Sequence, residues 1–534
     1  MSVAENNLSD DPKILKQQLA EMVQLLAQKD QALSEKDQAL SKKDQLISEK
    51  SLLIDILEEY VRLHKLKQFG RKSEVSDTQQ DMFNEAEFSV EAEAYLPPEE
   101  DDNAPKAPAK SKPRRQALPA ELPRIIIEHD LPEAKKVCSC GCQRTEMGEE
   151  RSEQLDIIPA KIQVLVHVRK KYACKACEEG VVTAPLPPQP IPKSNASPGL
   201  LAHIATAKFQ DAQPLYRQES TLKRSGISLP RNTTASWMVK GGQLIQPLIN
   251  LLAERQRDYP ILHCDETPLQ VLNEPEKAPT SRSYMWVTVG GPPTQPIRLF
   301  HYADSRSGAV VGELLSGYQG YLQTDDYAGY GAVVAENNLT HLGCWAHARR
   351  YFIKAQKLQP QKKKNTKPSQ ADIAISLIGK LYQIEREIKE EAPEIKQRIR
   401  QEKALPQLDK IRQWLDKALH RTLPKGQLGK ALGYLDKNWS KLTVYVEDGR
   451  LNIDNNPAEN AIRPFVIGRK NWLFSASVKG AKASSNLYSL IETAKANGLE
   501  PYVYLKQVFT ELPKAKSLEE IEALLPWNVA RTES

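Results

Sequence analysis

Hydrophobic positions recur every seven residues near the start of the chain. Leu, Ile or Val fills one position of each heptad from Leu19 to Val61, within the near-repeat KDQALSE, KDQALSK, KDQLISE. This period predicts a long helix with coiled-coil character over residues 1–74. Because the second core position carries residues such as Lys36 or Asp37, we expect weak dimerisation or partner contact rather than a rigid zipper. A solvated single helix is the alternative interpretation.

A change of composition follows the heptads. Residues 75–122 begin acidic and then become basic and proline-rich, in APKAPAKSKPRRQALP. Such composition is typical of a disordered linker. Its basic half suits contact with the DNA backbone, and a solvated tether fits equally well.

Alternating apolar and polar residues predict a small β-rich module over residues 123–190. It contains five of the seven cysteines, in a CSCGC turn and a C-x-x-C turn. Two short cysteine turns facing each other across a hairpin supply the four soft ligands of a tetrahedral structural zinc. A cluster of unliganded thiols is the competing interpretation. The ligands we choose are Cys138, Cys140, Cys174 and Cys177, with Cys142 as a substitute within the first turn.

Helical patterns occupy residues 191–257. The segment LYRQESTLKRSGISLPRNTTASWM predicts a helix, a turn at Ser225-Gly226 and a second helix led by Ser228 and Pro230. A short helix, a glycine turn and a basic second helix are typical of a helix-turn-helix. An ordinary pair of antiparallel helices fits the same pattern. The basic side chains that would contact DNA here are Arg217, Lys223, Arg224 and Arg231.

The pattern changes to strands from residue 258. The segments ILHCDETPLQVL, SYMWVTVG and IRLFHYAD predict three strands, GAVVGELL a helix, and YLQTDDY and HLGCWAHA two more strands. This order matches the core of an RNase H-like α/β fold. Amphipathic helices follow as an insertion, so the chain is predicted to be a multidomain α/β protein. The core would occupy 258–352 and 447–505, the helical insertion 353–446, and a C-terminal tail 506–534.

Three carboxylates come from distant parts of this second half. Asp265 lies in the first predicted strand, Asp325 near the end of a later one, and Glu459 just inside a predicted helix. Carboxylates on core elements are costly unless positive charge meets them, and hard divalent cations are the usual answer. Three such groups in a basic protein predict a two-metal phosphodiester enzyme.

Two of these assignments have alternatives. Asp326 would point to the opposite side of the strand from Asp325, so only one of them faces the site, and we choose Asp325. Glu459 follows Asn456-Pro457-Ala458, where a glutamate also completes a capping box.

Basic residues near the acids are candidates for phosphate contact. His347 and Arg349 follow the last predicted strand, where they would hold a phosphate or merely end the strand. The residues after Glu459 suit phosphate binding or a solvated face equally well. They are Arg463, Arg469 and Lys470.

Bulk composition agrees with this picture without requiring it. Lys and Arg exceed Asp and Glu by 74 to 68, a net charge of +6, which permits nucleic-acid binding. The polar N-terminus is no signal peptide, and no apolar run approaches the ~20 residues that a membrane span needs. Clustered cysteines suit a reducing compartment. We expect a cytoplasmic protein that is nucleoid-associated when bound to DNA.

Over nearly its whole length the chain resembles bacterial insertion-sequence transposases of the IS-sixty-six type. The motifs that carry the resemblance include FGRKSE, LPRIIIEHDLPE, KYACKACE, DETPLQVL, LQTDDYAGY, GCWAHARRYF and DNNPAENAIRPFVIGRKNWLFS. The resemblance implies a DDE transposase whose acids are Asp265, Asp325 and Glu459. Asp326 stands where the family usually has glycine, and CSCGC departs from the commoner C-x2-C.

The resemblance also implies a mechanism and partners. Two Mg²⁺ ions held by the three acids would support strand cleavage at the element's ends, and the freed 3′-hydroxyl would then attack target DNA. The zinc module and helix-turn-helix would bind the terminal inverted repeats, and the N-terminal helix would form a homodimer or higher oligomer. Accessory proteins of the same element are further expected partners. A DNA-binding regulator, a structure-specific nuclease on the same fold and a coiled-coil scaffold are the competing functions.

Overall fold

The computed structural model describes residues 162–173, 181–358 and 368–529, together with isolated positions between Lys16 and Lys43. Those N-terminal positions are helical and exposed. The heptad positions, the 75–122 linker and the five clustered cysteines lie outside the described residues. Among the described helices, none is both long and apolar enough to cross a membrane.

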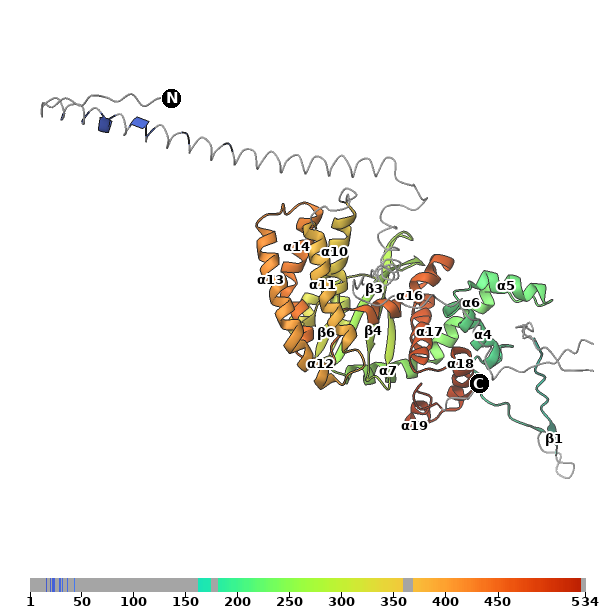
Figure 1. The fold of residues 1–534 in the computed structure, drawn as a ribbon. Helices are drawn as coiled ribbons and strands as arrows, with labels where there is room; N and C mark the ends of the chain where they lie inside the picture. Colours follow the sequence, from blue (N-terminus) through green and yellow to red (C-terminus); the bar gives the residue numbers. More distant parts are fainter. Residues whose placement is uncertain are drawn as a thin grey trace, which may run out of the picture. The chain divides into compact units, whose positions relative to one another are not determined.

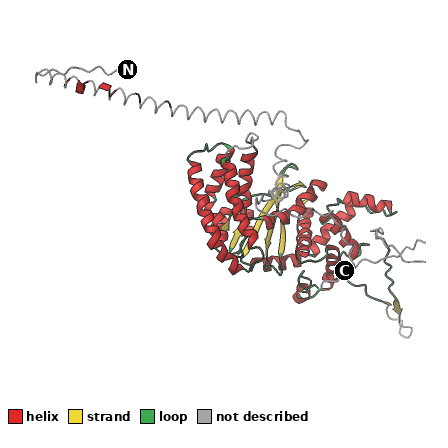
Figure 2. Cartoon of the chain, in the orientation of Figure 1, coloured by secondary structure: helices red, strands yellow, loops and turns green. Residues whose placement is uncertain are grey.

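The described chain is a mixed α/β protein with a central sheet and many helices (Figure 2). The strand order is β5-β4-β3-β6-β7, and β8 pairs with β3. The predicted three strands and helix are confirmed as β3 to β5 and α8 (Gly308–Leu314). The two further strands are β6 and β7, but helix α9 (Gly331–Glu336), which was not predicted, separates them. The strands are β3 (Ile261–Asn273), β4 (Arg282–Gly290), β5 (Ile297–Ala303), β6 (Tyr321–Gln323), β7 (Thr340–Leu342) and β8 (Ser475–Ser477).

Two strand predictions run too far. β6 ends at Gln323, so Asp325 and Asp326 both follow the strand instead of alternating along it. Asp325 Oδ1 accepts a hydrogen bond from the Tyr327 backbone N–H at 2.9 Å, a local turn that competes with strand pairing. β7 ends at Leu342, and the residues from Trp345 form helix α10 (Trp345–Lys357), which carries His347 and Arg349.

The chain divides into two compact units, and the first contains residues 263–265 of β3 together with 319–459. Here β6 and β7 pair in parallel, with Tyr321 opposite Thr340. Helices α10, α11 (Gln370–Glu387), α13 (Leu405–Leu419) and α14 (Gln427–Lys437) lie side by side (Figure 1). Between them Phe352 meets Trp414 edge-on, with ring centroids 5.9 Å apart. The helices after α10 are α11 (Gln370–Glu387), α12 (Pro393–Ile399), α13 (Leu405–Leu419), α14 (Gln427–Lys437) and α15 (Trp439–Thr443).

The second unit contains most of β3, strands β4, β5 and β8, and two groups of helices. The predicted turn is present between α5 (Leu215–Arg224) and α6 (Arg231–Leu244), and Gly226 adopts φ +78° there, a conformation that favours glycine. The first group is α4 (Pro198–Phe209), α5 (Leu215–Arg224), α6 (Arg231–Leu244) and α7 (Gln246–Arg257). The second is α17 (Val478–Ala496), α18 (Pro501–Glu511) and α19 (Leu518–Glu522).

Helix α17 covers β5, which lies at the end of the strand order. Ser489 Oγ accepts from the Phe300 backbone N–H at 2.7 Å, and Thr493 Oγ1 accepts from the Arg298 N–H at 3.1 Å. An edge strand otherwise presents open backbone groups. The small hydroxyl side chains therefore close this edge from within the unit.

A short hairpin precedes these helices. Strand β1 (Lys171–Ala173) pairs antiparallel with β2 (Val181–Thr183), with Lys171 opposite Thr183. Cys174 and Cys177 belong to the connection, which lies outside the described residues. The predicted β character of this end of the cysteine module is confirmed.

Candidate active site

Residues 263–265 of β3 are fixed to the loop that precedes α16 (Asn456–Trp472). The Asn455 side-chain N–H donates to the Cys264 carbonyl at 2.8 Å, and its backbone N–H donates to Cys344 Sγ at 3.2 Å. Both cysteines are fully buried, as their apolar neighbours predict. Asn455 therefore joins three distant segments of the first unit immediately beside Asp265.

His263 makes a second link to the same loop. Its Nδ1 lies 3.1 Å from Asn455 Oδ1, and its Nε2 lies 3.2 Å from Asn452 Nδ2. Burial lowers the pKa of His263 to about 4, so the ring is neutral at physiological pH. The two contacts require Nδ1 to carry the proton and Nε2 to accept, because the carboxamide oxygen accepts and the carboxamide nitrogen donates.

Asp325 and Asp326 have different surroundings. The Asp326 carboxylate pairs with Lys437 Nζ at 2.7 Å and lies 3.8 Å from Lys441 Nζ. The Asp325 carboxylate instead accepts a hydrogen bond from the Tyr327 backbone N–H. The helical segment that follows α13 thus supplies positive charge to Asp326.

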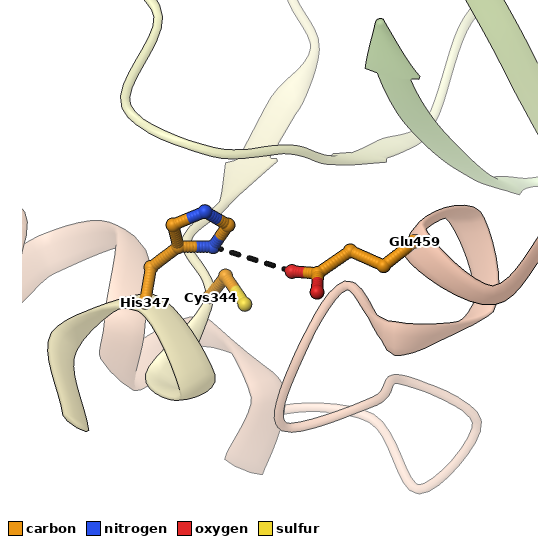
Figure 3. A group of neighbouring side chains, drawn as sticks. All are labelled: Cys344, His347 and Glu459. Atoms are coloured by element: carbon orange, nitrogen blue, oxygen red, sulfur yellow. Dashed lines mark ion pairs between the residues drawn. The ribbon is translucent and has the colours of Figure 1, made fainter. Parts of the chain in front are cut away.

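Glu459 lies in the first turn of α16 and faces helix α10 (Figure 3). Arg350 Nη2 contacts both carboxylate oxygens, at 2.5 and 2.7 Å, and His347 Nδ1 lies 3.4 Å from Oε1. The helix begins at Asn456, so the expected cap residue is already helical. The partners of the Glu459 carboxylate therefore include side chains from another helix, beyond a simple capping arrangement.

Arg350, and not the predicted Arg349, is the arginine that contacts this carboxylate. In a helix, positions three apart share a face, and His347 and Arg350 have that spacing. Arg349 is half-buried, and burial lowers its pKa. Recognising GCWAHARRYF as a helix start would have identified the pair.

Two neighbours of Glu459, His347 and Cys344, carry no charge. Burial, together with Arg350 and Lys354, lowers the pKa of His347 to about 3, so its imidazole is neutral. Burial and the nearby Glu459 raise the pKa of the Cys344 thiol above its usual range, so it stays protonated. Ligand atoms of Cys344, His347 and Glu459 lie within 4.8 Å of one another.

The donor chemistry of the acids fits a hard divalent cation. Carboxylate oxygens are the ligands that Mg²⁺ prefers, whereas a protonated thiol is a poor ligand for it. The fold also places positive charge directly against both oxygens of Glu459, in the form of the Arg350 guanidinium. The group of ligand atoms that lie within 4.8 Å of one another contains Glu459 but neither Asp265 nor Asp325, so the described residues do not bring the three predicted acids together as one such group.

Asp454 is a buried acid next to this site. Tyr382 O–H donates to its Oδ2 at 3.0 Å, and the Asn456 backbone N–H donates to its Oδ1 at 3.2 Å. Burial raises its pKa from 3.8 to about 6. The folded state therefore holds this proton more tightly than the unfolded chain does. The resulting stabilisation is complete below pH ~4 and is lost as the pH rises through about 6.

Asp454→Asn should therefore gain stability relative to wild type between pH 4 and 7, by up to about 2–3 kcal/mol. Urea unfolding of both proteins at the two pH values measures the difference. Asp448→Asn is the matched control, because Arg450 lowers the pKa of Asp448. Relative to wild type, Asp448→Asn should therefore lose stability as the pH rises from 4 to 7. If the difference in free energy of unfolding between Asp454→Asn and wild type does not change with pH, the raised pKa of Asp454 is contradicted.

The candidate DNA contacts differ in exposure. Arg217, Lys223, Arg224 and Arg231 are all exposed on α5 and α6. On α16, Lys470 is exposed and Arg463 is half-buried. Arg469 is buried, and burial lowers its pKa to about 10, which argues against direct contact between this side chain and a DNA backbone.

Comparison with known proteins agrees with this arrangement. A family model described as "Transposase IS66 family" matches residues 193–483, more than half of the chain. Three further models match neighbouring segments: "IS66 C-terminal element" over 489–527, "zinc-finger binding domain of transposase IS66" over 135–178, and "Transposase C of IS166 homeodomain" over 56–127.

Relatives of similar length also match. The uncharacterized protein y4jD of Sinorhizobium fredii (strain NBRC 101917 / NGR234) is 30% identical over 500 residues, covering 89% of this chain and 95% of that protein. The uncharacterized protein y4qI of the same organism is 33% identical over 440 residues, 79% of each chain. The class defined by these matches is a DNA-binding transposase with a zinc-finger module. The chain belongs to the IS66 transposase family, which confirms the resemblance seen in its motifs.

Proposed function

We propose that this chain is a DDE transposase that cleaves DNA at the ends of an insertion sequence and joins the 3′-hydroxyl ends to target DNA. One observation carries the proposal: Asp265, Asp325 and Glu459 come from three distant segments and belong to one compact unit. In that unit residues 263–265 and the loop before α16 are tied together through Asn455. The family match supplies the class of reaction.

The strand order supports an RNase H-like core. Three consecutive strands lie in the order β5-β4-β3, and β6 and β7 continue the sheet on the other side of β3. The helices α11 to α15 come between Asp325 and Glu459 in the chain, as an insertion between the second and third acids would. On this proposal Asp265 and Asp325 lie on or just after neighbouring strands.

Asp265, Asp325 and Glu459 would hold two Mg²⁺ ions. When bound, such ions polarise the phosphodiester and lower the pKa of the attacking water. Arg350 fixes the orientation of the Glu459 carboxylate, and its planar guanidinium is also the group best suited to a DNA phosphate. Neutral His347 accepts from Arg350 Nη1 at 3.4 Å through Nε2 and so positions that guanidinium.

The helices α5 and α6, the zinc module and the N-terminal helix would bind DNA and pair subunits. The exposed basic residues of α5 and α6 and the zinc module would bind the terminal inverted repeats, with Zn²⁺ as a structural ion. The N-terminal helix would pair subunits so that two ends are held at once, and accessory proteins of the element would join that complex.

The test uses the purified full chain, a duplex carrying the DNA that flanks the gene, and a supercoiled target plasmid. With Mg²⁺ we expect cleavage at the element's end followed by a joined product, and neither with EDTA. Asp265→Asn should still bind the duplex but yield no product. Cleavage without joining would favour the nuclease, and binding without cleavage would favour the regulator.

A further inference from the structure

The turn directly after α16 exposes two large apolar side chains. Leu473 is 63% exposed and its neighbour Phe474 is 43% exposed. Ile467, on the last turns of α16, is 48% exposed. A single exposed apolar residue is ordinary, but two adjacent ones in a fixed turn indicate a surface that another molecule covers.

Leu473 is held in an unfavourable backbone conformation. Its φ is +66°, in the left-handed region that a branched side chain rarely enters. Its N–H donates to the Arg469 carbonyl at 2.7 Å, and the Phe474 N–H donates to the Trp472 carbonyl at 2.8 Å. Such strain persists only where the surrounding structure imposes it, and it concentrates at functional sites.

The residue before the turn anchors it. The Trp472 ring meets Phe465 edge-on at 5.4 Å, and Lys208 Nζ lies 5.1 Å from its centroid. Asn471 Nδ2 donates to the Ala212 carbonyl at 2.9 Å. The end of α16 is thereby attached to the segment that begins α5.

The residues after the turn are equally fixed. Ser475 pairs with Val271 as β8 begins, and Asn273 Nδ2 donates to the Ala476 carbonyl at 2.9 Å. Leu473 and Phe474 are therefore held between an anchored helix and a paired strand. A turn fixed at both ends presents its apolar side chains without a cost of ordering them on binding.

The charge around the turn selects the kind of partner. Between Asn460 and Ile491 the sequence has five basic residues and no Asp or Glu. On α16, positions 463, 467 and 470 step by four and three, so Arg463, Ile467 and Lys470 share one helical face. Lys479 and Lys482 are exposed beyond the turn. An apolar turn in a stretch of sequence that carries basic but no acidic residues fits a polyanion with accessible apolar faces.

We propose that Leu473 and Phe474 form a wedge that stacks against an unpaired base at the end of the DNA substrate, while Lys470 and Lys479 contact its backbone. This inference rests on the proposed function and adds the feature of the DNA that is recognised. Base faces are hidden inside an intact duplex, so an apolar contact of this kind needs an unstacked or frayed nucleotide. Phosphate contacts alone would leave both apolar side chains without a partner.

The test compares the full chain on a blunt duplex and on the same duplex with one frayed end carrying 2-aminopurine. Stacking on one base changes affinity by about 5- to 150-fold, so we expect at least about fivefold tighter binding to the frayed DNA and a change in 2-aminopurine fluorescence. Phe474→Ala should remove that preference and leave blunt-duplex affinity within about twofold. Phe474→Tyr, which keeps an aromatic face, should retain it.

Two further variants separate the wedge from a general effect. Leu473→Gly suits the positive φ, so its melting temperature should not fall, yet its preference for frayed DNA should weaken. Leu518→Ala removes a side chain that is also exposed, at 55%, but lies beside Glu519 and Glu520. This variant should keep the wild-type preference for frayed DNA.

Two outcomes would overturn the wedge. Wild type that binds both DNAs equally would refute it and leave the transposase proposal intact, since the cleavage assay tests that proposal separately. A Phe474→Ala protein with unchanged DNA preference but a smaller oligomer would show that the turn contacts protein. Absence of any DNA binding would refute the wedge and the proposed function together.

Discussion

Asp325→Asn should lower metal-dependent strand cleavage by about 10³-fold, whereas Asp326→Asn should leave it within a few fold. A carboxylate that holds a catalytic metal supports several kcal/mol of charge stabilisation in the transition state, which is equivalent to this loss. Single-turnover cleavage of end-containing DNA, with protein in excess over DNA, measures the chemical step for both variants.

The surroundings of the two aspartates make the pair a matched control. Asn at 325 still offers an Oδ1 to the Tyr327 N–H, so the turn after β6 should survive the substitution. Asn at 326 loses its ion pairs with Lys437 and Lys441. Lys437 is largely exposed, so this loss should cost less than about 1 kcal/mol of stability. The reverse pattern, with cleavage lost only in Asp326→Asn, would make Asp326 the second acid.

Among the described elements, the long central strands were predictable from the sequence, and short ambiguous segments were not. The segment HLGCWAHA predicts one continuous strand. Trp345, Ala348 and Phe352 are all buried, however, and their spacing of three and four is that of a helix face. So short a segment cannot distinguish a strand from a helix, and the packing of α10 against α11 and α14 decides.

The candidate site was predictable only in part because its contacts are long-range. Asn455 and Cys264 are 191 positions apart, and no local pattern predicts their hydrogen bond. The resemblance to a family selected Glu459, but the choice of Arg350 over Arg349 depends on how α10 is rotated. The positive φ of Leu473 likewise has no signature in its side chain, since nothing about leucine favours that conformation.

Arg400→Met should destabilise the first unit by about 3–5 kcal/mol, because it leaves a half-buried acid and several carbonyls without their partner. Arg400 is 2% exposed. Its Nε and Nη2 donate to the Glu385 carboxylate at 2.9 and 2.7 Å. Its Nη1 donates to the carbonyls of Tyr445 and Asp448, and its Nη2 also donates to the carbonyl of Leu451, each at 2.9 Å. All five guanidinium N–H groups are thus used, which lysine cannot reproduce.

These carbonyls lie in the segment that leads to Asp454 and Glu459, so Arg400 fixes the approach to the third acid as well as the helices. Urea unfolding of Arg400→Met and of Arg412→Met measures the difference. Arg412 pairs with Asp416 and Asp436 at the surface, and its loss should cost less than about 1 kcal/mol. Adding Glu385→Leu to Arg400→Met should recover part of the stability, because it removes the uncompensated carboxylate. If the double variant is no more stable than Arg400→Met, the carbonyl contacts rather than the ion pair account for the stabilisation.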